Sequence, residues 1–323
     1  MANPWDNDHG ISHQELQDRL TEALAHGEFH GTQSVKTDPP PLWFGEGWDC
    51  DVLRGFDGSD GIWYCKLPKR SGVQAWIRKE ASVLDHLKHN RFGLAPQVGL
   101  RGTPGKLPYE WLTVSEAPGL CLLHNLDRAD PAELGNSCGT VLRKLHTLSE
   151  SIGESIGERP PHAIHRVDSL VGESASALQA LNPHVDSNHL QRVRDMVEQA
   201  RGHIPEEVPT TFVHGDLYPE HIFFDKKTSQ VAHIIDWADA RWDDPAVDFA
   251  MLGWILGDAF LGSALDAYRP ADRSSFERRI YRLGTMSGIH DIRIAEQGGP
   301  NVSLELRIEV LQSRTTEGWL ERF

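Results

Sequence analysis

The spacing of apolar residues in the first third of the chain predicts one helix and then a small sheet interrupted by a second helix. Residues 12–26 begin with Ser12 and Glu15 in a capping-box arrangement, and their leucines recur at helical spacing. From 42 to 116, short runs of aromatic and branched residues alternate with Gly, Asp and Ser turns, as in an antiparallel sheet. The helix expected at 73–90 has an apolar stripe that we expect to be buried: Trp76, Ile77, Val83, Leu84 and Leu87.

Most of the remaining chain has the pattern of helices. Asp130 as N-cap begins a helix that runs through His146. Further helical stretches are expected near 166–181 and 186–201, and over most of 246–323. Between them, the apolar runs "HIFFD" and "QVAHIID", joined by the turn "KKTS", predict one pair of strands.

These elements predict an α+β fold in two lobes. The first, 1–117, consists of the N-terminal helix and the strand-rich region. The second, 118–323, is mostly helical and contains the strand pair. A chain of 323 residues is long enough for two such domains, since single cores rarely grow beyond this size.

Composition and charge narrow the possible partners. The formal net charge of −15 argues against binding to nucleic acid, which needs clustered lysine and arginine, and is compatible with a cationic small molecule. The four cysteines form no CxxC pair, which is typical of a protein from the reducing cytoplasm. The N-terminus does not have the pattern of a signal peptide, and no apolar run has the length of a membrane span. We therefore expect a cytoplasmic protein without a membrane partner.

The stretch "VHGDLYPEHIFFD" at 213–225 carries the clearest chemical pattern. His214 and Asp216 occupy their positions in the kinase catalytic-loop pattern H-R-D-L-x-x-x-N, with Gly215 in place of the arginine and His221 in place of the asparagine. Phosphoryl transfer needs a carboxylate near the proton of the acceptor hydroxyl. We therefore expect Asp216 to be the catalytic base or orienting carboxylate.

Asp236 follows twenty residues after Asp216, at the end of an apolar strand in "IIDW". In kinases, a carboxylate at this point holds Mg²⁺ at the phosphates, and hard oxygen ligands suit that ion. The order of a catalytic loop, a strand pair and this aspartate predicts phosphoryl transfer with Mg²⁺ held by Asp236.

The N-terminal lobe contains candidates for binding the phosphates. Lys66 lies at the end of a strand, like the V-A-I-K lysine that neutralises phosphates, and Glu80, fourteen residues later on the following helix, is placed to pair with it. Gly45 and Gly47 in "FGEGWDC" suit a loop that covers the phosphates, because backbone amides can approach closely there. The stretch "GLRGTPGKL" at 99–107 has one residue too many for a P-loop and is expected to be a surface turn.

The segment "VHGDLYPEHIFFD…HIIDWADARWDDPAVDFAM" resembles the aminoglycoside phosphotransferase family, small-molecule kinases with a protein-kinase-like fold. Asp244, Pro245 and Asp248 match the D-P-x-x-D pattern that follows the metal-binding aspartate of this family. The resemblance implies a bilobal kinase-like fold, GTP or ATP as phosphoryl donor, and Mg²⁺. It also implies that the hinge backbone at Ser115 and Ala117 contacts the purine.

His221 makes the chain look like one branch of that family. Most members have asparagine five residues after the catalytic aspartate, whereas a histidine there, with "HGDLY", "IDW" and "ARxDDPAxD", looks like the macrolide 2′-phosphotransferases. Those enzymes transfer the γ-phosphoryl of GTP, often in preference to ATP, to the 2′-hydroxyl of the amino sugar. The resemblance therefore implies a macrolide as the small-molecule acceptor of a monomeric enzyme. It leaves His221 as a direct metal ligand, a hydrogen-bond donor to phosphate, or a holder of metal-bound water.

Two alternatives stay open at the level of sequence. The acceptor of the same reaction could be an aminoglycoside, a choline-like alcohol or another metabolite. In a second class of function, the chain would bind nucleotide without catalysis, as a pseudokinase does, with His221 marking a degraded metal site. The polarity of the acceptor pocket would distinguish a macrolide from these other acceptors. Turnover on any acceptor would exclude the pseudokinase alternative.

Overall fold

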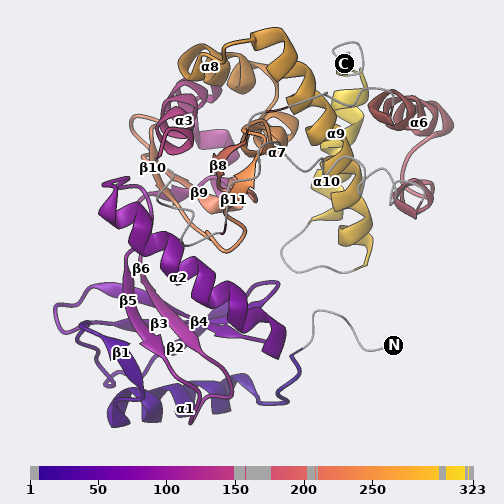
Figure 1. Cartoon of the computed structure of the whole chain (residues 1–323). Helices are drawn as coiled ribbons and strands as arrows, with labels where there is room; N and C mark the ends of the chain where they lie inside the picture. The colour runs from indigo at the N-terminus through magenta and orange to yellow at the C-terminus, as the bar shows by residue number, and fades with distance from the viewer. Residues whose placement is uncertain are drawn as a thin grey trace. The chain divides into compact units, whose positions relative to one another are not determined.

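The computed structural model describes residues 7–148, 157, 176–201, 208, 210–297, 303–316 and 319 (Figure 1). The chain forms two compact units: unit 1 consists of Met1–Pro118 with His233–Asp239, and unit 2 of Gly119–Ala232 with Ala240–Phe323. A division into two consecutive segments does not describe this arrangement, since a short piece of the later chain joins the first unit. That piece contains Asp236.

Unit 1 is built on a six-stranded antiparallel sheet with the strand order β1-β5-β6-β4-β3-β2. Its strands are β1 Phe29–Gly31, β2 Leu42–Glu46, β3 Cys50–Phe56, β4 Ile62–Pro68, β5 Val98–Gly102 and β6 Trp111–Ser115. The expectation of a surface turn at 99–107 is wrong for its first half, because β5 pairs with both β1 and β6. Leu100 and Leu107 are buried in the core.

Each face of this sheet is covered by one helix (Figure 1). Helix α1, His13–His26, begins as predicted after Ser12, whose hydroxyl accepts a hydrogen bond from the amide of Glu15 at 3.3 Å. It packs on the face of the sheet that carries Trp63 and Cys65. The other face packs against the 3₁₀ turn η1, Ser71–Val73, and helix α2, Gln74–His89. Alternation along β4 places Tyr64 and Lys66 on this second face.

The buried stripe expected on α2 needs one correction. Ile77, Val83, Leu84 and Leu87 are buried as predicted, but 46% of Trp76 is exposed. Trp76 precedes Ile77 and is rotated away from the sheet, because consecutive residues of a helix do not share a face.

Unit 2 is mostly helical. Its helices are α3 Pro131–His146, α6 Ser187–Arg201, α7 Val247–Leu256, α8 Asp258–Tyr268, α9 Arg273–Glu296 and α10 Leu304–Thr316, with 3₁₀ turns η2 Leu123–Arg128 and η4 Pro219–His221. Its short strands are β7 Leu120–Cys121, β8 Thr211–Val213, β9 Ile222–Phe224 and β11 Arg241–Asp243. Strand β10, Val231–Ile234, begins in this unit, and its last two residues belong to unit 1. The helices expected at 186–201 and after 246 and the strand pair are confirmed, whereas most of the helix expected near 166–181 lies outside the described residues.

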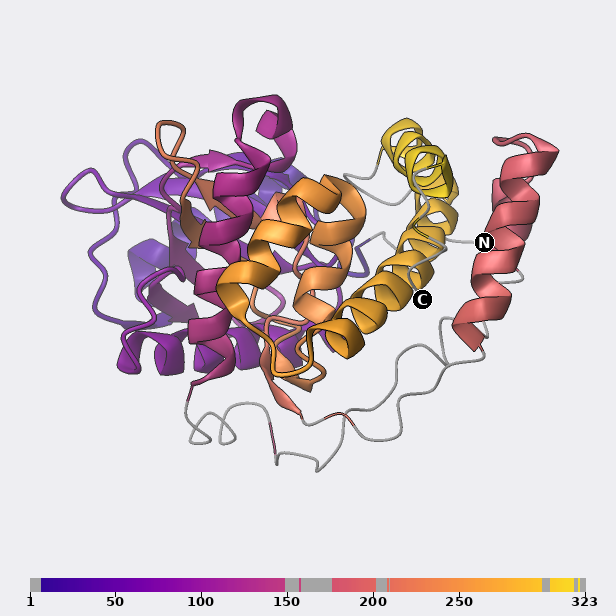
Figure 2. The ribbon, with the colours of Figure 1, turned by 90° about the horizontal axis from the view of Figure 1, so that it is seen from above.

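Close helix packing stabilises this unit. Helices α3 and α8 lie side by side, and a Cβ atom at Gly139 of α3 would lie 2.0 Å from the carbonyl oxygen of Ala264 in α8. Helices α9 and α10 are also neighbours, as both views show (Figures 1 and 2). No helix in the part of the chain that the structure describes is long and apolar enough to cross a membrane.

Candidate active site

In unit 1, the structure brings together three of the predicted site residues. The Nζ atom of Lys66 lies 2.8 and 2.6 Å from the two carboxylate oxygens of Glu80, and 2.9 Å from Oδ1 of Asp236. Glu80 is 2% exposed on α2, whereas 43% of the Asp236 side chain is exposed. The ammonium group is therefore fixed between an internal carboxylate and an accessible one.

Charge and burial act on Lys66 in opposite directions. Burial alone would lower its pKa, but the carboxylates of Asp236 and Glu80 outweigh burial and raise the pKa above its ordinary value. Lys66 is thus a permanent cation at neutral pH. Such a cation is suited to neutralising phosphate oxygens.

The backbone holds Asp236 in an unusual conformation. Its φ of 66° lies in the left-handed region, which aspartate tolerates better than most residues. The next residue anchors the segment. The amide of Trp237 donates to Oε1 of Glu80 at 3.3 Å, and its indole Nε1 donates to the carbonyl of Ile234 at 2.9 Å. Because Trp237 is fully buried, this anchor keeps Asp236 beside Lys66.

The glycines predicted to cover phosphates lie at the β2–β3 hairpin. Gly45 is in β2, where the pairing with β3 is irregular, and the amide of Gly47 donates to the carbonyl of Cys50 at 2.8 Å. A Cβ atom at Gly45 would meet no atom within 4 Å, so packing inside the protein does not require glycine there. Two aromatic residues, Phe44 and Tyr64, form an edge-to-face pair nearby with ring centroids 4.8 Å apart.

The predicted hinge residues follow β6. The amide of Ser115 donates to the carbonyl of Gln97 at 2.9 Å, so this amide is already used inside unit 1. A backbone contact from Ser115 to a purine therefore has to use its carbonyl. Ala117 lies two residues further on. The residue between them, Glu116, donates its amide to the carbonyl of Ile62 at 3.1 Å.

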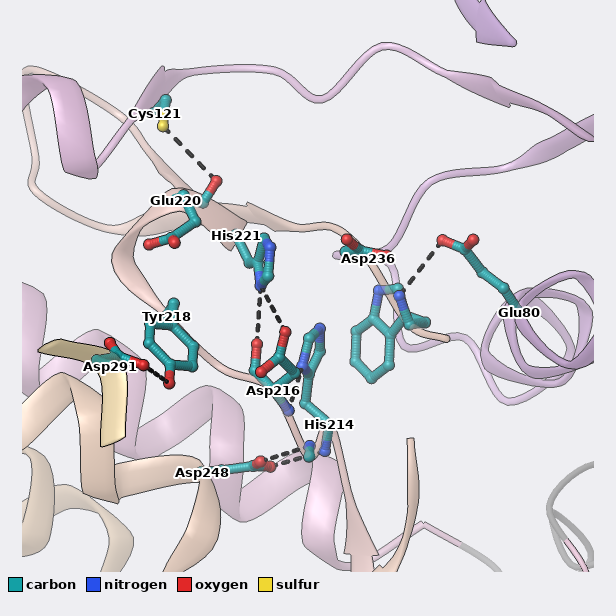
Figure 3. Close-up of polar contacts among 12 residues, drawn as sticks. Glu80, Cys121, His214, Asp216, Tyr218, Glu220, His221, Asp236, Asp248 and Asp291 are labelled. Carbon is teal, nitrogen blue, oxygen red and sulfur yellow. Dashed lines mark hydrogen bonds and ion pairs between the residues drawn. The ribbon is translucent and has the colours of Figure 1, made fainter. Parts of the chain in front are cut away.

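In unit 2, Asp216 and His221 stand at the two ends of one tight turn. His221 Nδ1 lies 2.8 Å from the carbonyl oxygen of Asp216, and the His221 amide donates to the carbonyl of Tyr218 at 3.0 Å (Figure 3). A carbonyl can only accept a hydrogen bond, so Nδ1 of a neutral His221 carries the proton and Nε2 carries the lone pair. The His221 side chain is thereby oriented by the residue that we expect to meet the acceptor hydroxyl.

Asp248 fixes the beginning of this loop. Its carboxylate accepts the amides of His214 at 2.8 Å and Gly215 at 2.9 Å (Figure 3), and Nε2 of His146 lies 3.1 Å from it. Burial would raise the pKa of Asp248, but the bonds from His146 and the Gly215 amide hold it below its ordinary value. Gly215 has a φ of 87°, which explains the glycine where protein kinases have arginine.

A second network meets the same loop from the C-terminal helices. The phenol of Tyr218 donates to Oδ1 of Asp291 in α9 at 3.0 Å, and Nε of Arg307 in α10 lies 3.2 Å from Oδ2 of Asp291. Sequence reasoning missed these residues, as it missed the role of His146. No local pattern identifies them, because Tyr218 and Asp291 are 73 positions apart.

The described residues contain no group of three or more His, Cys, Asp or Glu side chains arranged to hold a metal ion. Magnesium in kinase sites uses one or two carboxylates together with substrate phosphates and water, so it does not need such a group. An accessible carboxylate such as Asp236, held in a fixed backbone conformation, fits this requirement.

A sheet that carries the Lys66–Glu80 pair and a helical unit that carries the Asp216 loop define a kinase-like α+β protein. The sequence profile of the Phosphotransferase enzyme family matches residues 44–283, and the chain belongs to this family. The family expected from the sequence is thus confirmed.

Three individual comparisons agree with this assignment. YcbJ, an uncharacterised protein of Bacillus subtilis (strain 168), is 24% identical over 257 residues, which make up 77% of this chain and 81% of that protein. A mutant aminoglycoside 2′-phosphotransferase-IIIa solved with GDP has a TM-score of 0.71 at 16% identity, covering 96% of this chain and 100% of the other. Macrolide 2′-phosphotransferase MphH of Brachybacterium faecium has a TM-score of 0.57 at 18% identity, covering 91% and 98%. The expected kinase-like fold is confirmed.

Proposed function

We propose that this protein transfers the γ-phosphoryl group of GTP or ATP to a hydroxyl of a small molecule, with a macrolide as the acceptor. The placement of Lys66 between Glu80 and Asp236 carries the proposal. A buried glutamate that orients a lysine beside an accessible aspartate is the arrangement that kinases use to hold the donor phosphates.

The described contacts suggest a role for each donor-side residue. Lys66, oriented by Glu80, binds the α- and β-phosphates of the donor. Asp236 would hold Mg²⁺, which would supply positive charge at the donor phosphates. The backbone at Gly45 and Gly47 covers the phosphates. The exposed Phe44 and the half-buried Tyr64, on the same face as Lys66, offer an aromatic surface to the purine.

The acceptor side is assigned to the turn that begins at Asp216. The acceptor oxygen forms a bond to the γ-phosphorus while the bond to the β,γ-bridging oxygen breaks, and a nucleoside diphosphate leaves. The hydroxyl proton passes to the carboxylate of Asp216. His221 fixes the carbonyl of Asp216 through Nδ1 and would assist in holding Mg²⁺ through Nε2, which carries the lone pair.

Two features support a macrolide as the acceptor. First, His221 stands where most members of the family have asparagine and where the macrolide branch that the sequence resembles has histidine, and its Nδ1 bonds to the Asp216 carbonyl. Second, the net charge suits a cationic acceptor. The amino sugar of a macrolide carries a protonated dimethylamino group next to the reacting hydroxyl, which suits a protein with a formal net charge of −15.

An aminoglycoside is the second candidate acceptor, and one observation favours it. Besides Asp216, unit 2 contains two further carboxylates that act electrostatically on each other near the turn, those of Glu220 and Asp291. Oε2 of Glu220 is buried and has no hydrogen-bond partner among the residues that the structure describes. Several carboxylates around an acceptor site favour a polyamine over a macrolide, whose lactone needs apolar walls.

The test is mass spectrometry of the purified protein incubated with Mg²⁺, GTP or ATP, and a mixed panel of macrolides and aminoglycosides. The Asp216→Asn variant serves as the control, because it keeps the size of the side chain and removes the charge. We expect one added phosphoryl group on a macrolide, absent with the variant. NMR of the product then locates the phosphate at the 2′-position.

Each other outcome separates the alternatives. Phosphorylation of aminoglycosides alone would retain the donor-side assignments and overturn the macrolide as acceptor. Binding of GTP or ATP without modification of any acceptor in a broad panel would favour a nucleotide-binding protein without catalysis. Equal activity of the Asp216→Asn variant would remove Asp216 from the reaction.

A further inference from the structure

The turn that carries Asp216 and His221 also carries Tyr218, whose hydroxyl bonds outside the turn and whose ring lies edge-on to the His221 ring with centroids 6.5 Å apart. Tyr218 lies directly before η4, Pro219–His221, and the amide of His221 donates to its carbonyl. The backbone from Asp216 to His221 is therefore one closed unit, fastened by the bond between the His221 ring and the Asp216 carbonyl. Anything that moves Tyr218 also moves the two residues at its ends.

The phenol of Tyr218 is hydrogen-bonded to one of the C-terminal helices. Its Oη donates to Oδ1 of Asp291 in α9 at 3.0 Å, as Figure 3 shows. Burial raises the pKa of Tyr218 well above its ordinary value, so the phenol keeps its proton at neutral pH and acts as the donor.

Arg307 of α10 contacts both members of this bond. Its Nε lies 3.2 Å from Oδ2 of Asp291, and its guanidinium carbon lies 5.9 Å from the centroid of the Tyr218 ring, within the range of a cation–π contact. Arg307 is 2% exposed and Asp291 is 8% exposed. Two adjacent helices thus supply a carboxyl group and a cation that clamp one side chain of the catalytic turn.

Stability alone does not account for this buried pair. Removing two charges from water is costly, and replacing a buried ion pair with apolar residues is often neutral or stabilising. A buried pair can instead fix a geometry that apolar side chains would leave loose. The geometry available here is that of Tyr218, since both charges contact it.

We propose that Asp291 and Arg307 are positioning residues, which hold Tyr218 and thereby the turn that places Asp216 and His221 for phosphoryl transfer. The proposal rests on the proposed function. It differs from binding of an acceptor amine at Asp291, because the guanidinium of Arg307 already lies against one of the two carboxylate oxygens and would repel a second cation.

The first measurement is steady-state kinetics of Tyr218→Phe and Asp291→Asn. Tyr218→Phe removes only the phenol oxygen and keeps the ring beneath Arg307. We expect kcat to fall by about tenfold to a hundredfold, the effect of a small misplacement of a reacting group, with little change in the KM for nucleotide. The double variant is expected to be no slower than the slower single variant, because both changes break the same bond.

Variants of Arg307 test the cation. Arg307→Met is expected to lower kcat, and Arg307→Lys to recover part of the loss because it restores the charge. Arg278→Met is the matched control, since Arg278 is an exposed arginine on α9 and bonds only to Ser274 among the contacts described. Variants that lose thermal stability while kcat stays at the wild-type value would overturn the proposal in favour of a merely structural pair. A rise in acceptor KM at unchanged kcat would assign the site to binding.

Hydrogen–deuterium exchange separates this proposal from the proposed function, because it needs no turnover. In Tyr218→Phe we expect faster exchange of the amides at 216–222 and unchanged exchange in the α3–α8 pair. Faster exchange in a protein that phosphorylates nothing would retain the positioning contact and refute the proposed reaction. Unchanged exchange together with unchanged kcat in an active enzyme would refute the positioning role alone.

Discussion

The ammonium nitrogen of Lys66 lies 2.6 Å from Oε2 of Glu80, a carboxylate that is almost completely buried on α2. The second oxygen of Glu80 accepts the amide of Trp237, the residue that follows Asp236. Glu80 therefore orients the cation and also fixes the segment that carries the accessible carboxylate. One side chain links two of the residues proposed to bind the donor.

Loss of Glu80 is expected to act on donor binding and catalysis together. Glu80→Gln removes the negative charge that orients Lys66, and Lys66→Ala removes the cation. We expect both to lower kcat/KM for the nucleotide by about a hundredfold or more, as for loss of a charged group that stabilises the transition state. Lys88→Ala, an exposed lysine on the same helix, is the control. Wild-type activity of Lys66→Ala would remove the donor assignment.

His221 and Asp236 are expected to differ sharply under substitution. His221→Asn keeps a donor for the Asp216 carbonyl and should retain measurable activity, whereas Asp236→Ala should abolish it because the oxygen ligand is gone. Imidazole suits transition metals better than it suits Mg²⁺, which prefers oxygen ligands. If Nε2 contacts the metal, the ratio of activity with Mn²⁺ to activity with Mg²⁺ should fall in His221→Asn. A constant ratio would assign His221 to phosphate or to the turn alone, and full activity of Asp236→Ala would remove the metal assignment.

Asp248 is expected to govern both the stability and the order of the catalytic loop. Asp248→Asn replaces one acceptor oxygen with an amide donor facing the backbone amides, so we expect a loss of about 3 kcal/mol in the free energy of unfolding. The folded-state pKa of Asp248 is depressed, so its contribution is present above its ordinary pKa and is lost as pH falls through the folded value. The difference between wild type and variant should therefore shrink in acid. Denaturant unfolding at neutral and acidic pH measures it.

Much of unit 1 is predictable because its signals are local. The Ser12 cap, the alternation in β4 and the spacing of Lys66 and Glu80 each depend on neighbouring residues or on one helix following one strand. Strand β5 was missed because its glycines weaken the strand pattern, although its place between β1 and β6 compensates for low propensity. Trp76 was misplaced because an apolar residue beside the true stripe is indistinguishable from a member of it.

The support of the catalytic turn was not predictable, for a different reason. Asp216 and Asp236 stand in motifs whose spacing reflects a reaction. His146, Asp291 and Arg307 meet that turn only through the packing of helices distant in sequence. A buried arginine or aspartate on a helix has no pattern of its own, so its role becomes visible only from its contacts.

Asp291 predicts a dependence of stability on pH that is opposite in sign to that of Asp248. Burial raises its pKa to about 7, and the charges of Glu220 and Asp216 add to this effect while Arg307 and the Tyr218 phenol oppose it. The unfolded chain releases this proton near pH 4, so the stability that protonated Asp291 provides is lost as pH rises from about 4 to about 7. Relative to Asp291→Asn, the wild type should lose on the order of a few kcal/mol across this window and nothing above it. Chemical denaturation of both proteins between pH 4 and 9 measures the difference, and a constant difference would contradict a raised pKa.

The close contact of α3 and α8 predicts that a methyl group destabilises the protein at one glycine and not at another. Gly139 lies in α3, where a Cβ atom would stand 2.0 Å from the carbonyl oxygen of Ala264, a backbone atom that cannot move without shifting α8. Gly139→Ala should therefore lower the free energy of unfolding by about 1–3 kcal/mol, the range for overpacking, despite the better helix propensity of alanine. At Gly262 in α8, an added Cβ atom would meet no neighbouring atom within 4 Å. Gly262→Ala should therefore raise the free energy of unfolding by about 0.5–1 kcal/mol. Thermal and denaturant unfolding of the two variants compares them directly, and equal effects would mean that the two helices do not pack as closely as described.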